Sequence, residues 1–162
     1  MNISPEKTAA VLVELLKSSG MTCATAESCT GGGVSQAITS VSGASEVFLG
    51  GAVTYANSAK ESVLGVSSDT LERYGAVSSE CAAEMAEGSR RLYGADIAVS
   101  ITGIAGPGGG TAEKPVGTVW FAVSSSSGTR AEKAFFQGDR ELVRKQAVVH
   151  ALGMLVIAAT SV

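Results

Sequence analysis

The sequence predicts an α/β protein, a three-layer α/β/α sandwich around a mixed, mostly parallel sheet. Short apolar runs typical of strands alternate with segments of helical periodicity, as expected for a sheet covered by helices on both faces. Two adjacent late strands, 116–125 and 130–137, indicate a hairpin and hence an antiparallel part of the sheet. With 162 residues, 45% hydrophobic and 17% charged, the chain is expected to form one domain, 1–162.

Helices are predicted from apolar periodicity, from capping residues and from the glycines that follow them. Ser4 and Pro5 open the first helix, which ends near Lys17 just before Gly20. Further helices are predicted at 34–41, 57–64, 68–74, 79–93 and from the cap Asp139 to about 159.

Strands are predicted where short β-forming runs lie between turn residues. Besides the hairpin, these runs cover 21–26, 46–55 and 95–101. Gly50-Gly51 interrupts the second of them, and 102–115 is predicted to be a long glycine-rich loop.

Charge and composition exclude several classes of protein. A net charge of −3 and a pI near 5.2 leave no polybasic footprint, which argues against a nucleic-acid partner. No apolar run approaches the ~20 residues that a membrane span needs, and the N-terminus does not resemble a signal peptide. Three cysteines without C-x-x-C spacing argue against a disulfide framework or a zinc site. We therefore expect a cytoplasmic protein.

The segment Glu27-Ser28-Cys29-Thr30-Gly31-Gly32-Gly33 is the most informative in the chain. It joins a predicted strand to a predicted helix and concentrates nucleophilic side chains and free backbone N–H groups, which suit an anion or an oxyanion. Ser28, Cys29 and Thr30 are rival nucleophiles. The alternative is a glycine-rich packing turn in which Cys29 is a small buried apolar residue.

A hydroxyl nucleophile needs a base. His150 is the one histidine and lies in an apolar stretch of the last helix, which disfavours a Ser-His-Asp triad. A Ser–Lys pair remains, and Lys60 is the best base because it follows a strand end and has Tyr55 nearby. The alternative for Lys60 is an exposed helix charge. Weaker rivals are Lys114, Lys133 and Lys145.

Two later segments have residue types that bind ligands. Thr102 and Gly103 begin a glycine-rich stretch that matches neither common phosphate fingerprint, so close backbone approach to a ligand and a flexible surface loop are both open. Arg140 and Arg144 share one face near a helix N-terminus, where they suit a phosphate; a solvated pair balanced by neighbouring acidic residues is the alternative. The sequence shows no carboxylate pair or metal cluster.

Six segments, in order across roughly residues 20–155, resemble the CinA carboxy-terminal family, the nicotinamide-nucleotide amidases. Each alone is a weak motif, and their order makes the resemblance specific. The segments are Ala26–Gly32, Val53–Tyr55 with Asn57 and Lys60, Gly75–Ser78, Thr102–Pro107, Lys114–Trp120, and Gly138–Arg140 with Arg144.

The resemblance implies an amidohydrolase without metal or cofactor that converts nicotinamide mononucleotide and water to nicotinate mononucleotide and ammonia in pyridine-nucleotide recycling. In family terms Ser28 corresponds to the nucleophile and Lys60 to its base, and we assign Tyr55 a supporting role in positioning or proton relay. From residue chemistry we expect N–H groups of 30–33 or 102–104 to hold the oxyanion and two arginines to hold the 5′-phosphate. The expected substrate-binding residues are Thr30, Gly31, Gly32, Thr102, Gly103, Arg140 and Arg144.

Two alternatives stay open. One is a regulatory or ligand-binding module of the competence/damage-inducible type that has lost turnover; the other is an amidase that uses Cys29. Larger members of the family also carry an amino-terminal domain resembling molybdopterin-binding enzymes, and we expect this chain to act without it. Glycine-rich loops near one face are compatible with a homo-oligomer, but the sequence does not fix the oligomeric state.

Overall fold

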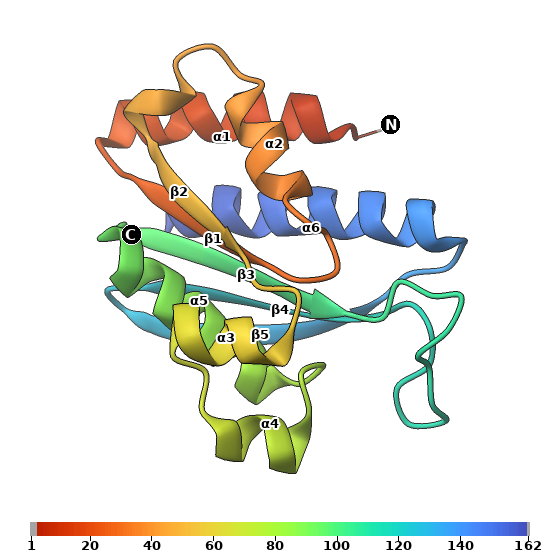
Figure 1. Ribbon diagram of the computed structural model, residues 1–162. Coiled ribbons are helices and arrows are strands. Elements are labelled where there is room, and N and C mark those ends of the chain that lie inside the picture. The colour runs from red at the N-terminus through yellow and green to blue at the C-terminus, as the bar shows by residue number, and fades with distance from the viewer. Residues whose placement is uncertain (1–2, 162) are drawn as a thin grey trace.

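A five-stranded sheet with the order β2-β1-β3-β4-β5 forms the centre of the computed structural model, which describes residues 3–161 (Figure 1). Strand β1 pairs in parallel with both β2 and β3, whereas β3–β4 and β4–β5 are antiparallel. Only β4 therefore runs opposite to the other strands. The sheet is mixed and mostly parallel in strand direction, as the sequence predicts. The strands are β1 Cys23–Glu27, β2 Phe48–Val53, β3 Ile97–Gly103, β4 Thr118–Ser125 and β5 Gly128–Phe135.

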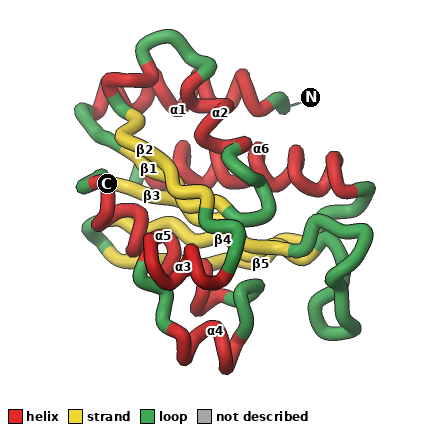
Figure 2. The backbone as a smooth tube through the Cα atoms, in the orientation of Figure 1, coloured by secondary structure: helices red, strands yellow, loops and turns green. Residues whose placement is uncertain are grey.

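Helices cover both faces of the sheet, so the predicted three layers are confirmed (Figures 1 and 2). One face is covered by α1 (Pro5–Ser19), α2 (Gly33–Thr39) and α6 (Arg140–Thr160). The other face is covered by α5 (Ser79–Tyr93), against which α3 (Asn57–Leu64) and α4 (Ser68–Tyr74) pack. A short 3-10 turn, η1 (Ala44–Glu46), precedes β2.

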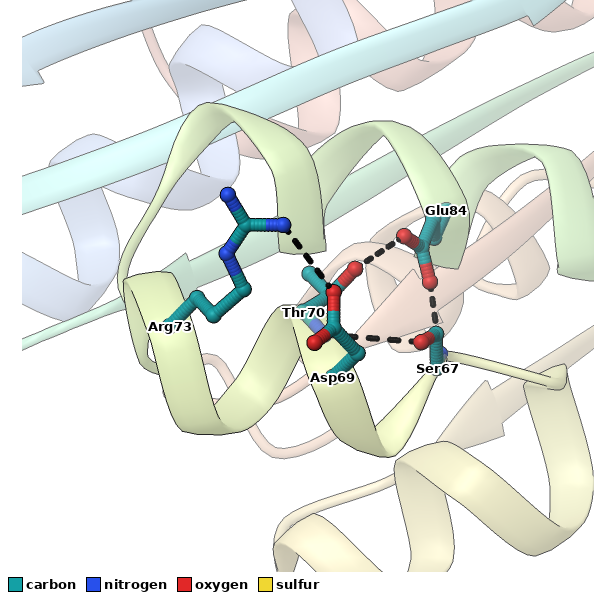
Figure 3. Close-up of polar contacts among 5 residues, drawn as sticks. All are labelled: Ser67, Asp69, Thr70, Arg73 and Glu84. Atoms are coloured by element: carbon teal, nitrogen blue, oxygen red, sulfur yellow. Dashed lines mark hydrogen bonds and ion pairs between the residues drawn. The ribbon is translucent and has the colours of Figure 1, made fainter.

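The helices begin and end where their capping residues predict. The Ser4 side chain caps α1, Asp139 caps α6, and Gly20 ends α1 in the left-handed conformation. Helix α4 is also fastened to α5 through Glu84, which points toward α4 in Figure 3. The Glu84 carboxylate accepts from the Ser67 N–H at 2.6 Å and from the Thr70 hydroxyl.

The main core lies between the sheet and the α1/α2/α6 layer. Leu12, Ile38, Phe121 and Leu152 are fully buried there. A smaller cluster on the opposite face joins α3 and α5 to β1 and β2. These two layers hold the carboxyl ends of β1, β2 and β3 in place, and the turns that follow these ends form the candidate site.

Most differences from the predicted elements are at strand ends. Strand β2 starts at Phe48 rather than at 46, because η1 takes up the residues before it. Strand β3 runs to Gly103, so Thr102 and Gly103 pair with β4 instead of belonging to the predicted loop. The hairpin strand β5 begins at Gly128, two residues earlier than predicted.

Helix α6 corrects one expectation. By length and composition it could cross a membrane, with a mean hydropathy of 1.5 over its most apolar window, and no other helix of residues 3–161 could. Half of that window is buried inside the fold, against α1 and the sheet. The apolar character of α6 is therefore accounted for by its place in the core.

Candidate active site

A cavity of about 280 Å³ lies at the carboxyl ends of β1, β2 and β3. Open α/β sheets commonly bind ligands at this edge. Five separate segments line it: the turn after β1, the β2–α3 connection with Lys60, the residues before α5, the end of β3 with the glycine-rich loop, and the start of α6. The lining residues are Ser28, Cys29, Tyr55, Asn57, Lys60, Ala76, Val77, Thr102, Gly103, Ile104, Ala105, Gly106, Gly108, Gly109 and Arg140.

Ser28 directly follows β1, and its N–H donates to the Ile101 carbonyl of β3 at 3.0 Å. The chain then turns sharply, with the Gly31 N–H donating to the Ser28 carbonyl at 3.0 Å. Gly31 and Gly32 have φ values of +59° and +99°, a region that favours glycine. The glycines after Ser28 thus allow the turn that leaves its hydroxyl at the cavity.

The Glu27 carboxylate holds this turn from within. Glu27 is fully buried, and its oxygens accept from the Thr30 hydroxyl at 2.7 Å and from both the N–H and the hydroxyl of Ser35 at 3.0 and 2.8 Å. They also accept from the Val34 N–H at 2.9 Å. A buried carboxylate needs such donors, and it satisfies N–H groups at the start of α2 that would otherwise lack partners. The sequence analysis gave Glu27 no role, although an acidic residue shortly before a helix is a capping signal.

The Lys60 Nζ lies 3.1 Å from the Ser28 Oγ. It also donates to the carbonyls of Thr54 at 2.8 Å and Tyr55 at 3.1 Å. A neutral amine has two hydrogens and one lone pair. If its hydrogens go to the two carbonyls, the lone pair faces the Ser28 hydroxyl, which is the arrangement that a general base requires.

Burial favours the neutral form of this amine. Lys60 is 1% exposed, and no carboxylate within residues 3–161 forms an ion pair with it. Desolvation lowers the pKa of Lys60, because the charged form loses its hydration. The exposed helix charge that was the alternative for Lys60 is therefore wrong.

Cys29 has a different environment, although it follows Ser28 directly. Its side chain is buried among core residues, and this burial raises the pKa of the thiol to about 11. Because the thiolate is the nucleophilic form, this raised pKa makes the thiol a poor nucleophile near neutral pH. This argues for Ser28 rather than Cys29 as the nucleophile.

Gly103 offers a backbone N–H donor that points toward β1, the neighbouring strand that ends at Ser28. The Ile104 N–H donates to the Thr118 carbonyl at 2.9 Å, and in an antiparallel ladder alternate N–H groups point to opposite sides. The Gly103 N–H therefore points away from β4, toward the end of β1 where Ser28 lies. A Cβ at this position would lie 2.8 Å from the Thr118 carbonyl oxygen, so the close approach of the strands requires glycine. The Thr102 hydroxyl donates to the Ala76 carbonyl at 2.8 Å and links β3 to the segment before α5.

Arg140 and Tyr55 meet at the mouth of the cavity. The Arg140 guanidinium donates to the Gly106 carbonyl at 2.8 Å and to the Tyr55 hydroxyl at 3.3 Å. Tyr55 is 64% exposed, so its side chain lines the cavity at the protein surface rather than in the interior. Arg140 thereby joins the start of α6 to two other walls of the site and keeps further N–H donors for a ligand.

Arg144 lies one turn further along α6 and does not line the cavity. Its Nε donates to the Cys29 carbonyl at 3.0 Å and its Nη2 to the Thr30 carbonyl at 3.3 Å. Thr30, Gly31 and Gly32 likewise shape the turn without lining the cavity. Their predicted substrate contacts, and that of Arg144, stay predictions.

The other predicted site residues do meet. The structure brings Ser28, Lys60 and Tyr55 to one cavity with Thr102, Gly103 and Arg140. Asn57 and Val77 also line it; the sequence analysis gave them no role, although both belong to the segments that carry the family resemblance.

The remaining candidates lie elsewhere. The ring centroids of His150 and Phe121 are 4.4 Å apart, and the His150 Nε2 lies 2.7 Å from a Glu132 carboxylate oxygen. His150 therefore has a structural role. None of the rival bases Lys114, Lys133 and Lys145 lines the cavity. Among residues 3–161, no group of three or more His, Cys, Asp or Glu side chains could hold a metal ion.

The fold and the site define an α/β/α sandwich with a pocket at the carboxyl edge of its sheet, built around a buried lysine and a serine. The chain belongs to the CinA family: the model of the CinA C-terminal domain matches residues 5–158. This confirms the resemblance that the motifs indicate.

Relatives agree with this assignment. The chain is 54% identical to a protein named nicotinamide-nucleotide amidohydrolase PncC from Enterobacter agglomerans. The 138 aligned residues cover 85% of this chain and 84% of that protein. It is 51% identical over 150 residues to a CinA-like protein from Thermotoga maritima, but spans only 36% of that relative's length. The crystal structure of the competence/damage inducible protein CihA from Agrobacterium tumefaciens is similar throughout, with a TM-score of 0.93 at 40% identity, covering 99% of this chain and 100% of that one.

Proposed function

We propose that this chain is a nicotinamide-nucleotide amidase that converts nicotinamide mononucleotide and water to nicotinate mononucleotide and ammonia. The observation that carries the proposal is the 3.1 Å contact of a buried, carbonyl-bound Lys60 with Ser28 in a cavity at the sheet edge. The similarity to the PncC amidohydrolase along most of both chains supports this substrate class. The reaction fits a single domain that acts without a metal or cofactor, in cytoplasmic recycling of pyridine nucleotides.

In the first half of the reaction, Ser28 attacks the carboxamide carbon of the substrate. The hydroxyl proton passes to the Lys60 lone pair as the Oγ–C bond forms, and the carbonyl π electrons move onto oxygen. The resulting oxyanion needs N–H donors. The Gly103 N–H, which points toward the end of β1 where Ser28 lies, would supply one. The C–N bond then breaks, its electron pair goes to nitrogen, and Lys60 returns the proton to release ammonia. An ester on Ser28 remains.

In the second half, water replaces the amine. Lys60 accepts a proton from water as the new O–C bond forms, and the ester bond to Ser28 breaks with return of that proton to the Oγ. The carboxylic acid group of the product, nicotinate mononucleotide, then ionises. Lys60 ends neutral, as it began, and its contacts with the two backbone carbonyls hold the amine in place through both steps.

We propose that the phosphate of the nucleotide lies at the mouth of the cavity. Arg140 provides charged donors there, and the exposed glycines Gly108 and Gly109 also line the cavity. A guanidinium and backbone N–H groups are common phosphate ligands. Tyr55, which contacts Arg140, would then position the nucleotide over Ser28.

The direct test is release of ammonia from nicotinamide mononucleotide by the purified protein, with nicotinate mononucleotide identified by mass. We expect turnover that does not depend on added metal and is unaffected by chelators. Binding of the nucleotide without any ammonia release would instead favour a regulatory ligand-binding module. Absence of both would contradict the proposed substrate.

A further inference from the structure

Arg144 contacts the carbonyl groups of Cys29 and Thr30, the two residues that directly follow Ser28. Its Nε lies 3.0 Å from the Cys29 carbonyl oxygen and its Nη2 lies 3.3 Å from the Thr30 carbonyl oxygen. A planar guanidinium fixes the relative orientation of two acceptors, which a single ammonium cannot do. These contacts cross from α6 to the turn, 115 residues away in sequence.

From these contacts we propose that Arg144 is a positioning residue for the Ser28 turn, not a ligand of the substrate. By holding the Cys29 and Thr30 carbonyls, it keeps the turn in the conformation that presents the Ser28 Oγ to Lys60. The catalytic consequence rests on the proposed amidase function, whereas the effect on the turn does not.

The packing of α6 on the turn supports this role. A Cβ built on Gly31 would lie 3.3 Å from the Arg144 Nη2, so the absence of a side chain there leaves room for the guanidinium. A Cβ on Gly33 would lie 2.9 Å from a methyl group of Val148, one helical turn beyond Arg144. Two glycines of the turn thus allow the same face of α6 to approach. Helix α6 thus contacts the turn through the Arg144 guanidinium, and the Glu27 carboxylate binds the turn separately through the Thr30 hydroxyl.

The contrast with Arg140 separates positioning from binding. Both arginines are on α6, but Arg140 lines the cavity and Arg144 does not. Removing a phosphate ligand should weaken binding of the phosphorylated substrate. Removing a positioning residue should instead slow the chemical step for any substrate, because small displacements of a nucleophile are costly.

The kinetic test compares Arg144→Gln and Arg144→Lys with wild type on nicotinamide mononucleotide and on the phosphate-free riboside. We expect Arg144→Gln to lower kcat roughly 10- to 100-fold on both substrates, with KM changed less than about 3-fold. Arg144→Lys should recover only part of kcat, because an ammonium cannot fix both carbonyls. Lys145→Gln removes a neighbouring charge outside the cavity and should leave both constants unchanged. A KM increase confined to the nucleotide, or an unchanged kcat, would overturn the proposal.

Hydrogen exchange provides a readout that does not depend on the reaction. Amides of residues 29–34 should exchange faster in Arg144→Gln than in wild type or Lys145→Gln, because the turn loses its outer support. Equal protection in all three proteins would overturn the positioning role. If the exchange changes as expected but wild type turns over neither substrate, only the amidase function is contradicted.

Discussion

The Lys60 Nζ and the Ser28 Oγ lie 3.1 Å apart, although 32 residues separate them in the chain. Ser28 follows β1, and Lys60 is on α3, which follows β2. Because β1 and β2 are parallel neighbours, their carboxyl ends meet at one edge of the sheet. The pairing of the two strands therefore brings the proposed nucleophile to the proposed base.

Substitution of Ser28 and Cys29 should separate the two neighbouring candidate nucleophiles. Ser28→Ala should abolish ammonia release, by about 1,000-fold or more, because no hydroxyl remains beside Lys60. Cys29→Ala should retain most activity and lose only some stability from the buried thiol. Initial rates and thermal unfolding of both variants check this. An inactive Cys29→Ala beside an active Ser28→Ala would contradict the assignment of the nucleophile.

The pH dependence should follow deprotonation of Lys60. Burial lowers the pKa of this amine, and the neutral form is the base, so kcat/KM should rise with pH and level off above that lowered pKa. The midpoint should be below the usual lysine value of about 10.4. The measurement is kcat/KM across pH, with Lys60→Ala as an inactive control. A rate that falls as pH increases through neutrality would contradict a lysine base.

Arg140 should affect nucleotide and riboside differently. Arg140→Gln removes the charged donors at the mouth of the cavity, so KM for the nucleotide should rise roughly 10-fold, with a much smaller change for the riboside. Steady-state kinetics on both substrates measure this difference. Lys145→Gln, on the same helix but outside the cavity, is the matched control. Equal effects of Arg140→Gln on the two substrates would remove the phosphate role.

Glu27→Gln should destabilise the protein by about 1–3 kcal/mol. The amide of glutamine has one acceptor oxygen where the carboxylate has two, and its NH₂ would face backbone N–H groups. Urea unfolding gives the change in free energy. Glu80→Gln, at an exposed site in the first turn of α5, should change stability by less than about 0.5 kcal/mol. A loss as small as that control would show that the carboxylate is not needed.

Gly88 and Gly153 form a matched pair for helix packing. A Cβ at Gly88 of α5 would lie 2.0 Å from the Leu64 carbonyl oxygen, so Gly88→Ala should destabilise the protein by about 1–3 kcal/mol. A Cβ at Gly153 of α6 would meet nothing within 4 Å, so Gly153→Ala should stabilise it by about 0.5–1 kcal/mol. Urea unfolding of both variants checks the opposite signs. Stabilisation by Gly88→Ala would contradict the close crossing of α3 and α5.

The helices could be predicted because their signals are local. Ser4, Asp139 and Gly20 mark helix ends through contacts within a few residues, and the structure places them there. The ends of the strands were predicted less accurately than those of the helices. Thr102 and Gly103 belong to β3 only because β4 pairs with them from a distant part of the chain, and glycine-rich sequence alone predicts a loop.

The sequence by itself predicted the α/β class, the turn at Ser28 and, since the one histidine lies in an apolar helix, a lysine as the candidate base. Only the tertiary structure decided how these residues are used. Burial lowers the pKa of the Lys60 amine and raises that of the Cys29 thiol, and burial depends on packing from the whole chain. The two arginines show the same limit. Their spacing predicts that Arg140 and Arg144 share one helix face. Only the position of α6 against the turn directs Arg140 to the cavity and Arg144 to the carbonyls of the two residues after Ser28.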